Sequence, residues 1–180
     1  MKYISILRGI NVGGFKKIKM DDLRALYELS GFGKVVTYIQ SGNVIFETEI
    51  KNKNVLKGKI ERAIERKYGF FVPVEIRTNR EIKSIIKNCP FGSIDPVEEG
   101  TKVSVTFLSS KPSEVKVFEI QKHIFTPDKL VIKGEEAYLY CPNGYGKSKL
   151  SNAFLEKKLG VSATTRNWKS VHKLYELSLQ

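Results

Sequence analysis

The segment Gly144-Tyr145-Gly146-Lys147-Ser148-Lys149 contains the residue types that bind phosphate groups. It follows a strand-like run at residues 137–141 and precedes a segment with helical character. Main-chain N–H groups at the start of a helix attract anions, and neighbouring lysines add positive charge. We therefore predict an anion-binding loop made by Gly144, Gly146, Lys147, Ser148 and Lys149.

The spacing of this loop is close to that of the phosphate-binding P-loop, G-x-x-x-x-G-K-[ST], but does not match it. Cys141 holds the position of the first glycine, and no apolar strand ending in a metal-binding aspartate is evident. The pattern favours a weaker anion site over a nucleotide hydrolase. The alternative interpretation is a plain helix start capped by Ser148 or Ser151.

A second polar segment, Thr164-Thr165-Arg166-Asn167, is predicted to form a turn before the last helix. Arg166 is its best candidate for an anion contact, because a guanidinium group binds phosphate through two parallel hydrogen bonds. Thr165 and Asn167 belong to the same predicted site, although either residue can instead cap the helix that follows.

A third polar loop follows the first predicted strand, at residues 2–8. Its glycines, from Gly9 to Gly14, do not have the G-x-G-x-x-G spacing of a dinucleotide site, and they also suit an irregular turn. The side chains that we include in the predicted site, some from this loop and some from a later turn, are Arg8, Asn11, Gln40, Ser41 and Asn43.

The elements that must position these loops occur in the same order in the two halves of the chain. The first half has predicted strands at 2–8, 35–40, 43–47 and 72–77 and helices near 20–30 and at 54–68. The second half has strands at 102–108, 129–133, 136–141 and 161–165 and helices at 112–121 and 149–159. A helix follows each half, the first one opened by the capping box Thr78-x-x-Glu81. The predicted fold is α+β, with two tandem ferredoxin-like β-α-β-β-α-β repeats at residues 1–88 and 101–180 and a connection at 89–100.

Two local details of the first repeat are predicted as well. Ser41-Gly42 is expected to form a two-residue hairpin turn. The alternation along the fourth strand is expected to point Glu75 and Arg77 outward.

This topology predicts that the polar loops cluster. In the first repeat, the loop after the first strand and the turn between the second and third strands share one end of the sheet. In the second repeat, residues 142–149 and 164–167 share the opposite end of their sheet. If the repeats pack in opposite senses, the two clusters converge on one cleft. On this hypothesis, Asn11 and Lys147 belong to the same site.

Composition limits the classes of partner. The net charge is +12, and residues 1–90 carry 18 Lys and Arg against 9 Asp and Glu, so the first half is better suited to meet phosphates. The excess lysine has the alternative explanation that it keeps the protein soluble. No apolar run approaches the roughly 20 residues of a membrane span, and the first residues do not form a signal peptide. With Cys89 and Cys141 as its two cysteines, the chain is expected in a reducing cytoplasm and without a membrane partner.

Other chemistries find little support. No spacing of Cys, His and carboxylate residues indicates a zinc site, so we predict no metal, and the cofactor stays unknown. Cys141 as a nucleophile with His172 as its base is a minor alternative. The order of elements also suggests an RNA-recognition module, but residues 43–47 lack its aromatic signature. Tyr138 and Tyr140 share a strand face, where they can stack on bases or pack one sheet against another.

Three stretches carry a family resemblance: LRGINVGGFKKIKMDDLRAL, YIQSGNVIFE and YLYCPNGYGKSKLSNAFLEKKLGVSATTRNW. Together they resemble the bacterial family known as domain of unknown function 1697, over nearly the whole chain. The resemblance implies a compact cytosolic α/β protein and supplies no catalytic residues.

The sequence therefore predicts a protein that binds a phosphate-bearing ligand, either a small molecule such as a nucleotide or a nucleic-acid backbone. One alternative is an enzyme acting on a small phosphorylated substrate, with the same residues stabilising negative charge. The other is an interaction module whose sheets mediate self-association, as in a homodimer, without a ligand.

Overall fold

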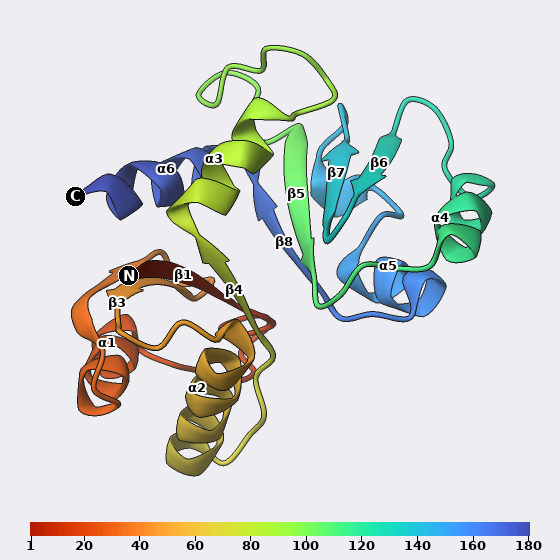
Figure 1. The fold of residues 1–180 in the computed structure, drawn as a ribbon. Coiled ribbons are helices and arrows are strands. Elements are labelled where there is room, and N and C mark those ends of the chain that lie inside the picture. The colour runs from red at the N-terminus through yellow and green to blue at the C-terminus, as the bar shows by residue number, and fades with distance from the viewer. The chain divides into compact units, whose positions relative to one another are not determined.

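The computed structural model describes residues 1–180 and has a mixed α+β architecture with six α-helices and two four-stranded antiparallel sheets (Figure 1). The chain divides into two compact units, one made of residues 1–82 with 174–180 and the other of residues 83–173. The predicted α+β class, with four strands in each half of the chain, is confirmed. The predicted boundaries at residues 88 and 101 stay predictions.

The first unit contains one sheet with the strand order β2-β3-β1-β4. Its elements in chain order are β1 (Lys2–Leu7), α1 (Met20–Leu29), β2 (Gly33–Tyr38), β3 (Asn43–Glu47), α2 (Lys53–Tyr68), β4 (Val74–Thr78) and the first turn of α3 (Asn79–Lys87).

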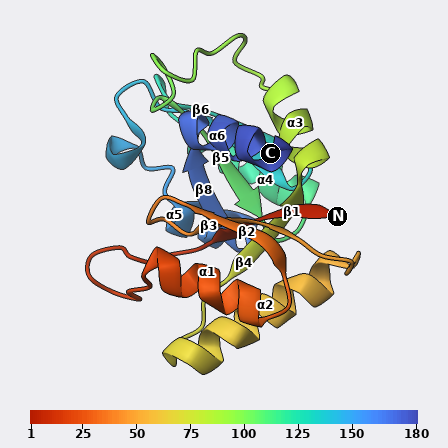
Figure 2. The same ribbon diagram turned by 90° about the vertical axis from the view of Figure 1, so that its left-hand side faces the viewer.

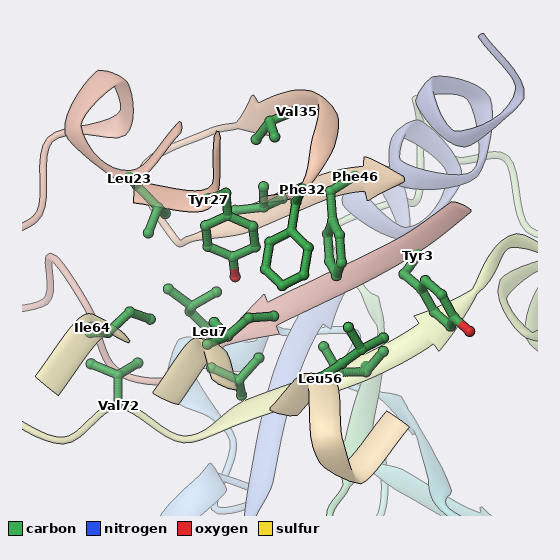
Figure 3. Packing of buried hydrophobic residues seen from close by; sticks show 14 of the residues in the cluster. Tyr3, Leu7, Leu23, Tyr27, Phe32, Val35, Phe46, Leu56, Ile64 and Val72 are labelled. Atoms are coloured by element: carbon green, nitrogen blue, oxygen red, sulfur yellow. The ribbon is translucent and has the colours of Figure 1, made fainter. Parts of the chain in front are cut away.

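The core of the first unit lies between the sheet and helices α1 and α2. Tyr27 from α1, Phe32 before β2 and Phe46 from β3 form an aromatic cluster, with ring centroids 4.6 Å apart for Phe32 and Phe46 and 5.4 Å apart for Tyr27 and Phe46 (Figure 3). The Tyr27 hydroxyl shares a 2.8 Å hydrogen bond with Ser5 Oγ, so its polar end is satisfied. Burial raises the pKa of Tyr27 above its ordinary value, although the Ser5 hydrogen bond works against that shift. Full burial of one such apolar side chain stabilises the folded state by about 1.5–3 kcal/mol.

Helix ends in the first unit follow from local sequence. Asn52 caps α2 by accepting hydrogen bonds from the Asn54 and Val55 amides, and Gly69 ends it with φ at 76°. Thr78 and Glu81 form the predicted capping box, in which the Glu81 amide donates to Thr78 Oγ1 and the Thr78 amide donates to the Glu81 carboxylate.

The prediction that Glu75 and Arg77 point outward to solvent is wrong, because they are 4% and 3% exposed. The prediction assumed one solvated sheet face, whereas Ile4 on the same face of the sheet is also fully buried. The charges are tolerated because Glu75 accepts a 3.0 Å hydrogen bond from Lys57 Nζ and lies 3.9 Å from the Arg77 guanidinium.

The two-residue hairpin at Ser41-Gly42 is also corrected. Strand β2 ends at Tyr38, and four residues, 39–42, connect it to β3. Gly42 has φ at 80°, and an added Cβ would lie 2.5 Å from Ile10 Cδ1 and 2.9 Å from Leu7 Cβ. The turn therefore packs tightly against the end of β1, which only glycine permits.

The second unit contains the other sheet, with the strand order β6-β7-β5-β8. Its core lies between the sheet and the helices α4 and α5, with Ile120, Leu139 and Leu155 among its buried members. Its elements are the rest of α3, β5 (Val103–Leu108), α4 (Glu114–Gln121), β6 (Lys129–Lys133), β7 (Glu136–Tyr140), the 3-10 helix η1 (Tyr145–Lys147), α5 (Asn152–Leu159), β8 (Ala163–Asn167) and the start of α6 (Trp168–Leu179).

None of these helices is both long enough and apolar enough to cross a membrane.

Candidate functional site

Four residues of the predicted loop, Gly144, Lys147, Ser148 and Lys149, line a pocket in the second unit, whereas Gly146 does not. The pocket has a volume of about 580 Å³ and lies between two segments, residues 123–128 and residues 142–150. The first segment connects α4 to β6, and the second connects β7 to α5. Two connections that are distant in sequence thus form one concave surface.

The main chain of the loop is held by its own turns. Gly144 has φ at 94° and precedes η1. The amides of Gly144, Lys147 and Ser148 donate to the carbonyl groups of Cys141, Gly144 and Tyr145, respectively. Because these three N–H groups are already bonded within the loop, the lysine side chains are the main groups left to meet an anion.

The side chains of Lys147 and Lys149 supply the positive charge of the pocket. Both residues are exposed, and both line the cavity. Ser148 between them is partly buried. The Ser148 hydroxyl donates to Asp128 Oδ2 at 2.6 Å and accepts from the Leu150 amide at 3.1 Å. The two lysines therefore flank a fixed serine.

Sequence reasoning missed Asp128, which lines the same pocket. It lies 20 residues from Ser148, in a segment with no motif. One local signal was present, because a Pro-Asp pair often forms a turn before a strand, but that signal does not identify its partner.

The loop is not a phosphate-binding helix start. Helix α5 begins at Asn152 and not at the predicted Lys149, and Ser151 is its N-cap, with Oγ accepting from the Phe154 amide. The capping alternative is therefore confirmed for Ser151. The field of a helix terminus falls off within one turn, so α5 adds little at Lys147.

The segment 164–167 is not a turn but belongs to strand β8. Thr165 Oγ1 lies 2.7 Å from Thr106 Oγ1 and donates to Asn152 Oδ1 at 2.6 Å. Asn167 Oδ1 accepts from the Ser170 amide at 2.8 Å, which confirms that Asn167 caps the last helix. The polar run forms a strand because residues 163–167 pair with β5, and the Thr165 hydroxyl finds its partners inside the unit.

Arg166 lies on β8, opposite Val105 of β5, and is 8% exposed. One guanidinium nitrogen, Nη1, donates to the Thr165 carbonyl at 2.9 Å. Burial lowers the pKa of Arg166 to about 10, because the low-dielectric surroundings disfavour the charged form. Its predicted anion contact stays a prediction.

The structure places the loop after β7 at the same end of the sheet as the end of β8. Tyr140 and Asn167 pair with the neighbouring residues Val103 and Ser104 of β5. In addition, the Tyr145 hydroxyl donates to Thr165 Oγ1 at 3.4 Å. The predicted clustering within the second repeat is confirmed.

In the first unit, Asn11 joins the two predicted polar segments. Its Nδ2 donates to the Ile18 carbonyl at 2.9 Å and to the Gln40 carbonyl at 2.8 Å, while Oδ1 accepts from the Ile18 amide at 2.8 Å. The predicted clustering within the first repeat is therefore confirmed, and the side chain of Asn11 is used to hold the loop. The residue has φ at 56°, a conformation that asparagine tolerates better than most residues.

The other predicted residues of this cluster have different environments. Asn43 is fully buried, and its Nδ2 donates to the Tyr38 carbonyl and to Ser41 Oγ, which fixes the turn. Gln40 is exposed. Arg8 is partly buried, and its amide donates to the Pro73 carbonyl at 2.9 Å. Ligand contacts by these residues, and the convergence of the two clusters on one cleft, stay predictions.

Cys141 and the two histidines of the second unit each contact other groups. Cys141 is 1% exposed, and burial raises the pKa of its thiol, although a hydrogen bond with Ser148 opposes that shift. His172 packs edge-on against the Trp168 ring at 5.0 Å. His123 lines the pocket, with Nε2 lying 2.7 Å from Lys158 Nζ. No group of three or more His, Cys, Asp and Glu side chains is arranged to hold a metal ion.

Comparisons with known proteins give a family and a fold. Residues 1–138 match the family described as "Protein of unknown function (DUF1697)". A solved structure of a conserved bacterial protein from Streptococcus pneumoniae is similar, with a TM-score of 0.77 and 23% identity over 99% of this chain and 98% of that one. No curated protein matches the sequence.

Proposed function

The chain belongs to the DUF1697 family, and from that premise we propose that its second unit binds a small phosphate-bearing ligand in the pocket lined by Lys147 and Lys149. The observation that carries this proposal is the position of the loop: the two exposed lysines line a cavity of about 580 Å³. Cavities of about 300–1,000 Å³ suit small ligands, so the size favours a nucleotide or sugar phosphate over a polymer.

The charges and hydrogen-bonding groups of the pocket are consistent with this ligand class. Two ammonium groups can donate charge-assisted hydrogen bonds to phosphate oxygens. The carboxylate of Asp128 lines the same cavity, and its Oδ2 atom accepts a hydrogen bond from the Ser148 hydroxyl. The carboxylate can accept hydrogen bonds from hydroxyl groups of the ligand, such as those of a sugar ring. The predicted contact from Arg166 belongs to the same unit as this pocket, whereas the contacts from Arg8 and Asn11 are predictions for the first unit.

We further infer that the two units are tandem ferredoxin-like repeats. Three correspondences support this inference. Both sheets have their strands in the same relative order, with the fourth strand beside the first. Each first strand pairs with the third and fourth strands in the antiparallel sense. In addition, Arg77 pairs with Ile4, the third residue of β1, as Arg166 pairs with Val105, the third residue of β5.

A second candidate function is an enzyme acting on a small phosphorylated substrate. The hydrogen bond from the Ser148 hydroxyl to the Asp128 carboxylate favours it, because a carboxylate can take the proton of an attacking hydroxyl. Release of inorganic phosphate or an altered substrate in the presence of the protein would distinguish this function from binding alone.

The proposal is tested by a thermal-shift screen with nucleoside monophosphates, sugar phosphates and inorganic pyrophosphate. Binding to the folded state raises the unfolding temperature in proportion to RT ln(1 + [L]/Kd). The double variant Lys147→Ala/Lys149→Ala should lose the shift. Lys157→Ala, which removes an exposed lysine in the last turn of α5, is the matched control and should keep it.

A shift that survives in the double variant, or no shift with any of these ligands, would contradict the proposal. A tight dimer in sedimentation experiments together with no ligand shift would favour the self-association alternative.

A further inference from the structure

The loop between β1 and α1 exposes large apolar side chains that a structural role does not explain. Phe15 is 77% exposed and Val12 is 65% exposed. The loop extends beyond the N-terminal end of α1 as a long excursion from the sheet (Figure 2). A benzyl side chain in water contributes nothing to the core, so its position suggests contact with a partner.

The loop is nevertheless firmly held. Val12 and Phe15 form an isolated antiparallel bridge, with the Phe15 amide donating to the Val12 carbonyl at 3.0 Å. The Asn11 amide donates to the Lys16 carbonyl at 3.2 Å, and the Asn11 side chain binds Ile18 and Gln40. Because hydrogen bonds already hold the loop in one conformation, its backbone loses little conformational entropy when the exposed ring binds a partner.

A second exposed ring belongs to the same surface. Lys16 Nζ donates to the Phe71 carbonyl at 2.7 Å, and the side chain of Phe71 is 49% exposed. Phe71 follows helix α2, whose last turn is basic. The hydrogen bond therefore connects the loop to a second element that carries an aromatic ring.

Lysines lie in the same loop and at the end of α2, together with the exposed Asp21 and Asp22 in the first turn of α1. Lys17 and Lys19 continue the loop and are exposed. Lys67, in the last turn of α2, donates to the Asp22 carbonyl in the first turn of α1 at 3.1 Å. The surface thus has aromatic rings and ammonium groups interspersed, in a half of the chain that carries 18 Lys and Arg against 9 Asp and Glu.

We propose that this surface binds single-stranded nucleic acid, with bases stacking on Phe15 and Phe71 and phosphates contacting Lys16, Lys17 and Lys19. Proteins that bind single strands combine a cationic track with aromatic rings on which successive bases stack. Each nucleotide of a strand carries one base and one phosphate, so rings and lysines on one surface can contact both parts of the ligand. A bilayer surface would instead favour a contiguous apolar face. This inference does not depend on the pocket of the second unit.

The proposal is tested by fluorescence anisotropy with a labelled oligouridine or oligothymidine of about 12 nucleotides, within the range of single-strand site sizes. Affinity should fall as the salt concentration rises from about 50 to 200 mM, because bound phosphates release counterions. Phe15→Ala should weaken binding by about fivefold or more, the effect of losing one stacked base. Phe118→Ala is the matched control, because Phe118 on α4 is 67% exposed and also has a lysine, Lys122, over its ring.

Two further substitutions separate stacking from general hydrophobic contact. Phe15→Trp keeps a ring and should retain affinity, whereas Phe15→Leu keeps an apolar side chain and should lose it. The double variant Lys17→Gln/Lys19→Gln should have a shallower slope of log affinity against log salt concentration. The decrease should be the amount expected from the loss of about two phosphate contacts. Since Phe15 is mostly exposed, circular dichroism spectra of its variants should match that of the wild type.

Three results would overturn the proposal: no binding of either oligonucleotide at low salt, equal affinity for the wild type and Phe15→Ala, or equal affinity for Phe15→Leu and Phe15→Trp. If the protein floats with vesicles that contain phosphatidylserine and does not bind the oligonucleotides, the surface would be assigned to a membrane instead.

Discussion

Asn11 and Gln40 are joined by a 2.8 Å hydrogen bond from the Asn11 side-chain amide to the Gln40 carbonyl. This bond connects the loop after β1 to the turn between β2 and β3, two segments that are 29 residues apart. The same amide group also donates to the Ile18 carbonyl, so both of its N–H bonds are used. Asn11 therefore determines the shape of the loop that presents Val12 and Phe15.

Replacing Asn11 with Asp should destabilise the first unit. The substitution places a carboxylate oxygen against two carbonyl oxygens and removes both donors, which should cost about 2 kcal/mol in the free energy of unfolding. Urea denaturation followed by circular dichroism measures the change. Asn54→Asp, at an exposed position in the first turn of α2, is the control and should be neutral or slightly stabilising. Equal stability of Asn11→Asp and the wild type would show that the loop does not depend on these bonds.

Gly42→Ala and Gly69→Ala form a second matched pair, since both glycines have positive φ, at 80° and 76°. An alanine Cβ at position 42 would collide with Ile10 and Leu7, whereas at position 69 it would meet nothing within 4 Å. Backbone strain alone should cost about 1 kcal/mol at Gly69. At Gly42, overpacking should add about 1–3 kcal/mol to that strain. The two changes in unfolding free energy, measured in urea, should therefore differ clearly, and similar values would refute the close approach at Gly42.

Sequence patterns predicted the features that depend on neighbouring residues. The capping box of Thr78 and Glu81 and the helix end at Gly69 involve contacts within a few positions, so composition and spacing reveal them. The partners of Ser148 and Thr165 were not predictable in this way, because Asp128 and Asn152 lie 20 and 13 residues away. The polar neighbours of Arg166 favour a turn, whereas its burial in β8 depends on pairing with β5.

The capping box predicts a dependence of stability on pH. Burial raises the pKa of Glu81, but hydrogen bonds from Lys53 and Thr78 outweigh burial, and the pKa is lowered overall. A carboxyl group with a lowered folded-state pKa stabilises the fold above its unfolded-state pKa of about 4.3, and this contribution is lost as the pH falls through the folded-state value.

Glu81→Gln should therefore destabilise the first unit at pH 7 by a modest amount, up to about 1 kcal/mol, because Glu81 is 40% exposed and water weakens its ion pair with Lys53. The difference from the wild type should disappear in acid, below the folded-state pKa. Urea titrations at a series of pH values measure it. Glu65→Gln removes an exposed carboxylate from α2 and should change stability at pH 7 by no more than a few tenths of a kcal/mol. A penalty for Glu81→Gln that is constant from neutral to acid pH would mean that the ion pair plays no part.

Asp128 gives the sharpest prediction for the pocket, because it carries negative charge in a cavity proposed to bind an anion. Asp128→Asn removes that charge, and the amide carbonyl of the substituted side chain can still accept the Ser148 hydroxyl. Affinity for inorganic pyrophosphate should therefore rise, by about two- to fivefold at low ionic strength, the effect of removing a partly solvated repulsion. Added salt should reduce this gain through screening. Isothermal titration calorimetry with pyrophosphate measures the change, with Glu119→Gln on α4, outside the pocket, as the control of equal charge. Weaker binding by Asp128→Asn would instead indicate that Asp128 holds Ser148 and the lysine loop in the conformation that binds phosphate.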